Sequence, residues 1–504
     1  MKLVKMSIAA AVACMVVTSA NAADTKPKRE IKGNMMEVYN TLPGTADNIT
    51  DAFANGVFYG RLRMNTFKWD YKDVDQDNSA LGLGGSMIYK TAPFAGLSAT
   101  AGLYYSNSPF VGIRGDNDNV GIVKAGKDTI SRKSVKENGD WSMTTLAQAY
   151  LQYDYSKTSV KAGRQIFESF ITASNDTKMI PNTFEGFSVE TKEVPQTTLR
   201  AAYFYAQKLR DHTTFHDVIT FDTNSISKDA TNASDWDNND DSAVHKGLSF
   251  KNFTDAGEDT EHKLIVADIK NTSIENLQID VTYAAVPDVI SSITGELNYM
   301  IGLPSGFSLT PGVRYMKQID NGGGKIGGAS LSGKVNAANE AAMGYTDGSS
   351  LDSSLAMARL VLKKGPLQAQ IAYSAVADEG DIVAPWRGFP TGGYTRAMAQ
   401  YNWAANTKTT EAEVKYDFGK ANLIPGFSAM ARYAMQDFDD SKQVAGVQAD
   451  SNILHMDFIQ KVATGLEAKF RVGLVSADKM SYGSSAGKDT NSYNEYRFEL
   501  NYLF

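Results

Sequence analysis

The sequence of 504 residues is poor in cysteine, histidine and proline, with one, five and 13 residues of each. The only cysteine, Cys14, lies in an N-terminal apolar stretch, so a chain processed after Ala22 has no disulfide and no thiolate metal site. Only one long apolar run is present and the mean hydropathy is −0.30, which argues against a helical membrane protein. The net charge of −7 lacks the basic balance typical of nucleic-acid binding, so no nucleic-acid partner is expected.

Residues 1–22 have the layout of a secretory signal peptide. Lys2 and Lys5 precede the apolar run 6–17, and Ala20-Asn21-Ala22 fits the small-x-small cleavage rule. The run is shorter than the roughly 20 residues that a membrane-spanning helix needs. Lipidation at Cys14 is the alternative, but Cys14 lies inside the apolar run. We therefore expect export, with cleavage after Ala22.

The rest of the chain is rich in glycine, tyrosine and phenylalanine (42, 24 and 23 residues), which favours β-structure. Segments 97–106, 276–285 and 408–418 alternate apolar and polar residues, the pattern of a strand with one apolar face. About eighteen such segments follow one another, many of them about ten residues long. A tilted strand needs about that length to cross a bilayer.

The connections between these segments alternate in length. Short links recur at every second position, whereas most of the others are long and polar, as in 107–143, 208–262, 319–354 and 377–407. Link 286–289 is short where a long one is expected. A soluble sandwich has no reason to place its long loops at one end, but a membrane barrel does. The sequence therefore predicts an all-β fold, a transmembrane antiparallel β-barrel of about 18 strands with short periplasmic turns and long external loops.

The C-terminal segment supports closure of this barrel. Tyr496, Phe498, Leu500, Tyr502 and Phe504 alternate with polar residues up to the end of the chain. In water such a strand would be an aggregation-prone edge, so we expect it to pair with the first strand. A buried terminal strand in a soluble sandwich is the alternative.

Two stretches resemble a known family. Ala162-Gly163-Arg164-Gln165 and the following segment 175–186 resemble the region after the fifth strand of OprD-type porins, with Lys178 where arginine is usual and Ile180 where leucine is usual. Asp51-Ala52-Phe53 resembles the related porins of Campylobacter-like bacteria.

The resemblance implies a passive diffusion porin of a Gram-negative outer membrane, without enzymatic activity, for small hydrophilic solutes and ions. It further implies carboxylate-bearing solutes such as amino acids or organic acids, and an inward third loop, 167–183. The organisation is then a signal peptide (1–22), an N-terminal periplasmic segment with a short helix (23–56) and a barrel (57–504). Expected partners are outer-membrane lipid, lipopolysaccharide and small polar solutes. The assembly is left open between a monomer and a homotrimer. The candidate constriction residues are Glu168, Asp176 and Lys178.

Alternation also predicts which charged residues line the pore. On the last four strands and the first, seven basic side chains are expected to face the lumen. We call them the basic arc, and they are Arg61, Arg63, Arg432, His455, Lys469, Arg471 and Arg497. Asp280 and Glu296 face it as an acidic wall, so the lumen would carry a transverse field that draws carboxylates along the arginines. In the alternative, Asp457, Glu467 and Glu499 pair with the arc and leave a hydrated wall.

Other motifs have weaker functional interpretations. His212 and His216 have the i, i+4 spacing of helical metal ligands but lie in a long loop. Gly-x-Gly-x-x-Gly at 322–327 also lies in a loop, so no dinucleotide site is expected. No catalytic constellation is found. An adhesive or surface-structural barrel and a soluble β-rich binding protein are the alternative functions. No cofactor is expected, and the candidates for loop calcium are Asp73, Asp75, Asp77, Asp235, Asp237 and Asp241.

Overall fold

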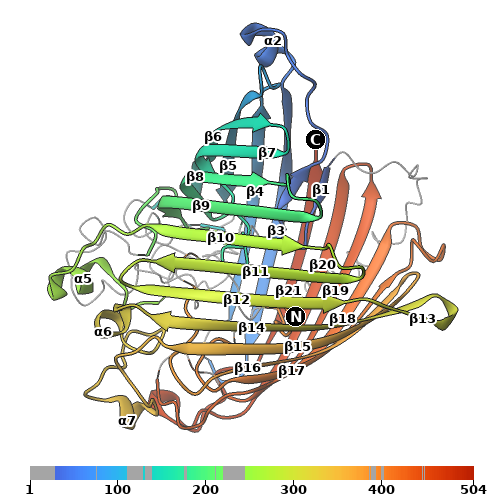
Figure 1. Cartoon of the computed structure of the whole chain (residues 1–504). Helices are drawn as coiled ribbons and strands as arrows, with labels where there is room; N and C mark the ends of the chain where they lie inside the picture. Colours follow the sequence, from blue (N-terminus) through green and yellow to red (C-terminus); the bar gives the residue numbers. More distant parts are fainter. Residues whose placement is uncertain are drawn as a thin grey trace.

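The computed structural model describes residues 29–33, 35–74, 77–109, 129–130, 135, 139–174, 179–210, 212–219, 245–384, 386, 393–398, 402–444, 447 and 449–504. The expected signal peptide, 1–22, lies outside these residues. Most of the described chain forms one closed antiparallel barrel (Figure 1). Its strands are β3 (Val57–Tyr71), β4 (Asn78–Lys90), β5 (Leu97–Asn107), β6 (Ser142–Tyr155), β7 (Thr158–Gln165), β8 (Thr183–Thr191), β9 (Thr197–Lys208), β10 (Leu264–Asn271), β11 (Leu277–Val286), β12 (Ile290–Tyr299), β13 (Ile301–Leu303), β14 (Phe307–Asp320), β15 (Ser353–Lys364), β16 (Leu367–Val376), β17 (Lys408–Asp417), β18 (Phe427–Asp437), β19 (Ser451–Ala463), β20 (Leu466–Ala477) and β21 (Tyr493–Leu503).

The barrel has eighteen strands, as the sequence predicts, because β12 and β13 act as one. Both pair with β14 in a single continuous register on either side of Met300. Every other strand pairs with its neighbours in sequence, and β21 pairs with β3 to close the sheet. At this seam the backbone N–H of Phe504 donates to the Gly60 carbonyl at 3.1 Å. The prediction that the last strand meets the first is therefore confirmed.

Period-two alternation gives the barrel an apolar outside and a polar inside. In β5, Leu97 and Leu103 are exposed on the outer face, whereas Ser98, Thr100 and Ser106 are buried on the inner one. Exposed leucines in such numbers are unfavourable in water but suit the hydrocarbon of a bilayer. The outer face is therefore the lipid-facing one.

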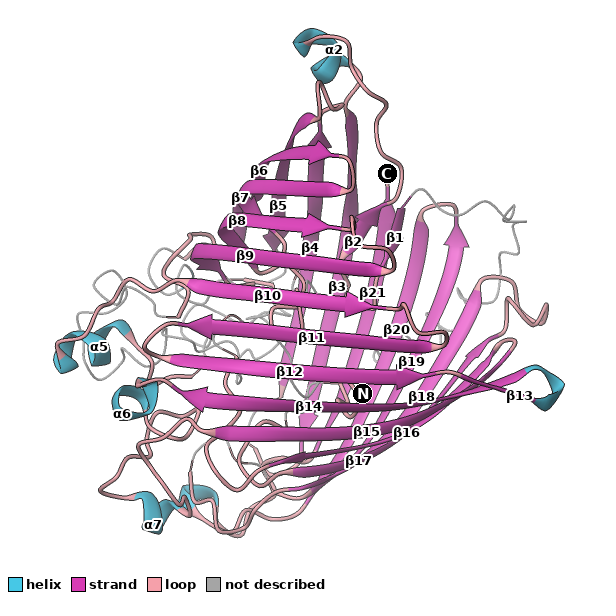
Figure 2. Cartoon of the chain, in the orientation of Figure 1, coloured by secondary structure: helices cyan, strands magenta, loops and turns pink. Residues whose placement is uncertain are grey.

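Short helices lie at both ends of the barrel. Figure 2 shows α5 (Phe250–Ala256), α6 (Gly323–Gly327) and α7 (Glu340–Met343) among the long loops, and α2 (Ile49–Ala54) apart from them. The described part of the chain also contains the 3-10 turns η4 (Pro304–Gly306) and η5 (Gly483–Ser485). Among the described residues, no helix is both long and apolar enough to span a bilayer.

The N-terminal segment before the barrel differs in part from expectation. The expected short helix is α2, but strands β1 (Arg29–Ile31) and β2 (Glu37–Tyr39) form a two-stranded sheet that contacts lumen-facing side chains. We call residues 29–33 and 35–39 the N-terminal hairpin. A wholly periplasmic position for residues 23–56 is thus wrong for this hairpin. Nothing in its local sequence distinguishes the lumen from the periplasm, so its contacts with the barrel wall could not be predicted.

Closure near the seam depends on a glycine in β4. Gly85 has φ 153°, and a Cβ there would lie 1.8 Å from the Arg61 carbonyl oxygen. Replacing Gly85 by alanine should therefore lower the free energy of unfolding by at least about 1–3 kcal/mol, since both backbone strain and a steric clash result. The measurement is the urea midpoint, followed by heat-modifiable gel mobility. Gly295→Ala in β12 is the matched control, because a Cβ there meets nothing within 4 Å. Equal midpoints for the two variants would contradict this assignment.

Candidate functional site in the barrel lumen

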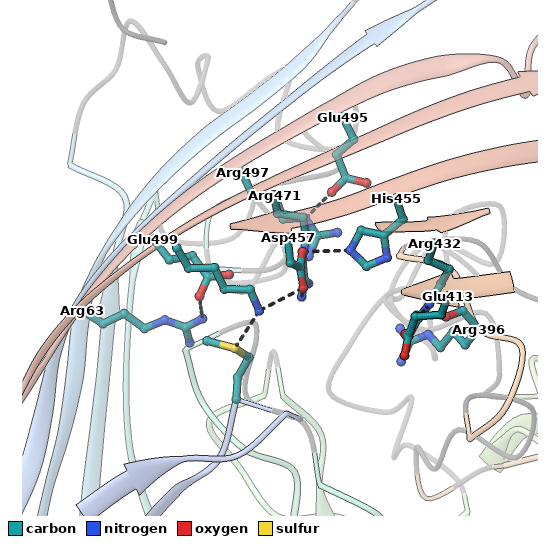
Figure 3. Close-up of polar contacts among 12 residues, drawn as sticks. Arg63, Arg396, Glu413, Arg432, His455, Asp457, Arg471, Glu495, Arg497 and Glu499 are labelled. Carbon is teal, nitrogen blue, oxygen red and sulfur yellow. Dashed lines mark hydrogen bonds and ion pairs between the residues drawn. The ribbon is translucent and has the colours of Figure 1, made fainter. Parts of the chain in front are cut away.

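All seven residues of the basic arc lie on the lumen wall, on the five adjacent strands β18–β21 and β3. The register sets Arg432 beside His455, and Arg471 beside Arg497. Arg61, Arg63, His455, Lys469 and Arg497 are each buried, with at most 7% of the residue exposed. Figure 3 shows that the labelled members of the arc share one stretch of wall and point inward. The strands thus bring these residues together although the sequence separates them widely.

Asp457 is the centre of this wall. Its two oxygens accept from Arg471, Nε to Oδ1 at 2.6 Å and Nη2 to Oδ2 at 2.8 Å, in a bidentate pair. His455 Nε2 lies 2.9 Å from Oδ1, and Lys469 Nζ lies 3.6 Å from Oδ2. One carboxylate therefore orders three basic side chains and offsets part of their charge. Such planar, two-point recognition is the geometry in which arginine binds carboxylates best.

The remaining arginines of the arc also meet carboxylates or carbonyl oxygens. Arg63 Nη2 lies 3.1 Å from Glu499 Oε2, and Arg497 pairs with Glu495. Arg432 donates from Nε to Glu413 Oε2 at 3.0 Å. The guanidinium of Arg61 donates to the backbone carbonyl of Met35, with Nη1 to O at 2.8 Å.

The arc is therefore interleaved with acidic residues instead of being a bare row of cations. Asp457 and Glu499 each pair with a cation of the arc, as predicted by the alternative in which acidic residues of the same wall neutralise the arc. Glu413 and Glu495 belong to the same set, and sequence reasoning missed them. Their positions on the lumen face of β17 and β21 were the available signal. Because each ion pair is held at the wall, the guanidinium groups keep fixed orientations toward the pore.

On the opposite wall, which the sequence predicts to be acidic, arginines accompany the carboxylates. Glu296 lies beside Asp280 in the register of the two neighbouring strands. Its Oε2 accepts a hydrogen bond from Arg314 Nε at 2.6 Å. Arg359 Nη2 lies 3.5 Å from Glu296 Oε1, so this carboxylate serves two arginines. Arg314 and Arg359 were missed, although both occupy inward positions by alternation. The Asp280 carboxylate accepts a hydrogen bond from the Gln278 amide.

The third external loop, between β7 and β8, folds into the lumen. The Phe167 ring packs edge-on against Phe204 of β9 at 5.5 Å, and the Arg314 guanidinium lies 4.1 Å from the centre of the Phe170 ring. The described residues of this loop therefore contact side chains of β9 and β14 inside the barrel. Of the candidate constriction residues, Glu168 forms an ion pair with Lys32 at 3.0 Å. Asp176 and Lys178 lie outside the described residues.

A second loop, 377–407, also enters the barrel, which the sequence did not predict. The Tyr394 hydroxyl donates to Glu296 Oε1 at 2.9 Å, and its ring lies under both Arg314 and Arg359. Farther along the loop, the Arg396 carbonyl accepts from Arg432 of the basic arc. The loop therefore links the two walls. Its tryptophans, two of the five in the chain and both buried, were a signal of an inward path.

The metal candidates do not assemble into a site among the described residues, where no group of three or more His, Cys, Asp or Glu could hold an ion. His212 Nδ1 lies 3.0 Å from His216 Nε2, so the two rings bond to each other. The carboxylates of Asp73 and Asp77 accept backbone N–H groups, at 2.9 and 3.0 Å. The remaining candidates, Asp75, Asp235, Asp237 and Asp241, lie outside the described residues.

A closed eighteen-stranded barrel with an apolar belt and a charged lumen narrowed by two loops is the architecture of a porin, a passive channel for small solutes and not an enzyme. Residues 118–504 match the family described as outer membrane porin, OprD family. The chain therefore belongs to the OprD family, and it lies in the outer membrane of a Gram-negative bacterium. The family suggested by the sequence is confirmed.

Solved structures show the same fold at low sequence identity. Pseudomonas aeruginosa OccK8 (OprE) is 13% identical with a TM-score of 0.64, over 90% of this chain and 99% of that one. Acinetobacter baumannii OccAB1 is 15% identical with a TM-score of 0.65, over 90% and 97%. Pseudomonas aeruginosa OpdK with vanillate is 13% identical with a TM-score of 0.62, over 90% and 99%. No curated protein sequence matches the chain significantly.

Proposed function

We propose that this channel favours small solutes that carry a carboxylate, and that the basic arc guides them. The observation that carries the proposal is the bidentate pair of Arg471 with Asp457, at 2.6 and 2.8 Å. It means that guanidinium groups of the wall are oriented for a planar carboxylate. A solute carboxylate can then replace a protein carboxylate at one arginine after another, with little reorganisation of the wall. OpdK, which has the same fold, was solved with vanillate, itself a carboxylate.

The test is the triple variant Arg61→Gln, Arg471→Gln and Arg497→Gln. Removing three lumen cations should move the reversal potential in a salt gradient toward cation selectivity, because the local potential for anions becomes less favourable. Uptake of a small carboxylate into proteoliposomes should fall several-fold, whereas uptake of a neutral solute of equal size should change little. Planar-bilayer recordings and liposome swelling measure the two effects.

The matched control removes three cations outside the lumen, by Lys251→Gln, Lys479→Gln and Lys488→Gln. These lysines are exposed, so their loss changes the net charge equally without changing the pore wall. Heat-modifiable mobility shows that each variant is folded. If the arginine variant kept wild-type selectivity and carboxylate uptake, the assignment of the basic arc would be refuted.

A further inference from the structure

The N-terminal hairpin occupies two cations of the basic arc. The Met35 carbonyl oxygen accepts from Arg61 at 2.8 Å, and the Met35 sulfur accepts from Lys469 Nζ at 3.6 Å. Met35 has φ 68°, a left-handed conformation uncommon for its type, and it is only 3% exposed. The tip of the hairpin is thus enclosed by the barrel wall at the point where the arc begins on the periplasmic side.

The hairpin also reaches other parts of the lumen. The Ser86 hydroxyl of β4 donates to Glu37 Oε2 at 2.9 Å, and the rings of Tyr39 and Tyr59 stack 4.6 Å apart. Lys32 pairs with Glu168 of the third external loop. The hairpin therefore connects strands β3, β4 and β20 to the inward loop. A segment with these contacts extends from the wall toward the centre of the channel.

The chain after the hairpin has the design of a tether. Helix α2 is fixed to the periplasmic turn 91–96, because Ala92 N–H donates to Ala52 O at 2.9 Å and Ala46 N–H to Pro93 O at 2.8 Å. Between hairpin and anchor, residues 41–45 are largely exposed, and Leu42 has 70% of its surface in contact with solvent. A hairpin with strands of three residues is marginal on its own. Its position thus depends on the lumen contacts.

We propose that the N-terminal hairpin is a displaceable plug that exchanges between a docked state, in which its Met35 carbonyl and sulfur occupy Arg61 and Lys469, and an undocked state, which a solute carboxylate favours by taking their place. A neutral carbonyl and a thioether are weaker acceptors for these cations than a carboxylate, because they carry no negative charge and cannot form the bidentate ion pair that arginine forms with a carboxylate. The identity of the displacing ligand, a carboxylate, rests on the proposed function. The plug itself does not, since it would narrow the channel for any ion.

The test locks the hairpin to the wall. Glu37→Cys with Ser86→Cys places two thiols where the side chains now touch, and the only native cysteine is Cys14. The folded variant is treated with a short bis-methanethiosulfonate, and single-channel conductance in KCl is recorded before and after reduction with dithiothreitol. The locked channel should conduct at least about twofold less than the reduced one, because pore cross-section limits ion flow. The single-cysteine variants, treated equally, should show no change on reduction.

A second variant replaces residues 29–39 by a glycine-serine segment of equal length. Its conductance should equal or exceed that of the reduced double-cysteine channel. The plug is wrong if locked and reduced channels conduct equally and the glycine-serine variant conducts like wild type. A folded barrel in which the two cysteines fail to cross-link would also contradict the docked position.

Displacement by carboxylate is measured separately, as the cross-linking yield in sodium acetate against sodium chloride at equal ionic strength. Acetate should lower the yield by competing for Arg61 and Lys469. An unchanged yield would overturn displacement by carboxylate.

If locking lowers KCl conductance while the triple arginine variant keeps its selectivity, the plug stands and the carboxylate preference fails. The reverse pair of results rejects the plug alone.

Discussion

Replacing Asp457 by asparagine should make the channel markedly more anion-selective and lower the stability of the barrel. The substitution removes one negative charge and leaves Arg471 and Lys469, both largely buried, without the carboxylate that now orders them. Removing one partner of a buried ion pair costs about 3–5 kcal/mol, because the other charge stays desolvated. Reversal potentials and urea midpoints report the two effects.

Asp457→Glu is the matched control for this prediction. It keeps the charge, so the reversal potential should stay near that of wild type, while the longer side chain disturbs the 2.6 and 2.8 Å pair with Arg471. We expect an intermediate midpoint for it. An asparagine variant with unchanged selectivity would mean that the ion pairs of the arc do not influence the permeating ions.

The architecture was predictable because a membrane barrel repeats one simple rule. Each strand must alternate apolar and polar residues, so inward and outward faces are readable from local sequence. Link lengths indicated the two ends, and the aromatic C-terminus indicated closure. The same parity placed Arg61, Arg471 and the other arc residues on the lumen side without any long-range information.

The partners of these residues could not be predicted in the same way. Which carboxylate faces which arginine depends on the stagger between neighbouring strands, and on rotamers that reach across it. The sequence predicts the pairing of Asp457 with the arc only as an alternative, and it gives no sign that Arg314 meets Glu296. Charge counting along a face therefore gave the composition of the wall but not its pairing.

Loop paths were the least predictable part. Segment 377–407 was expected to be external because it is long, yet Tyr394 and the buried Trp386 and Trp403 lie inside. The N-terminal hairpin was assigned to the periplasm because it precedes the barrel. In both cases the position depends on contacts with strands far away in sequence, such as Tyr394 with Glu296 and Met35 with Arg61.

Replacing Glu296 by glutamine should loosen both inward loops, which meet beside this residue. Glu296 holds Arg314 and Arg359, and these guanidiniums contact the ring of Tyr394 from loop 377–407, while Arg314 also contacts Phe170 from the third loop. An amide removes the charge that pairs both arginines, so the clamp on both loops should loosen. A cost of about 3–5 kcal/mol is expected for the uncompensated buried charges.

Trypsin cleavage at Arg396 in the reconstituted channel measures the freedom of loop 377–407, and open-channel current noise measures its motion in the pore. Both should rise several-fold in Glu296→Gln. Asp280→Asn is the control, because Asp280 pairs with Glu296 in register on the same wall and its carboxylate accepts from Gln278. Both substitutions remove one lumen charge and should shift selectivity toward anions to a similar degree, but only the loss of Glu296 releases Arg314 and Arg359. Equal cleavage rates and equal noise in the two variants would show that the loops are held by their apolar packing, with Phe167, Trp386 and Trp403 in one buried cluster, and not by this ion-pair clamp.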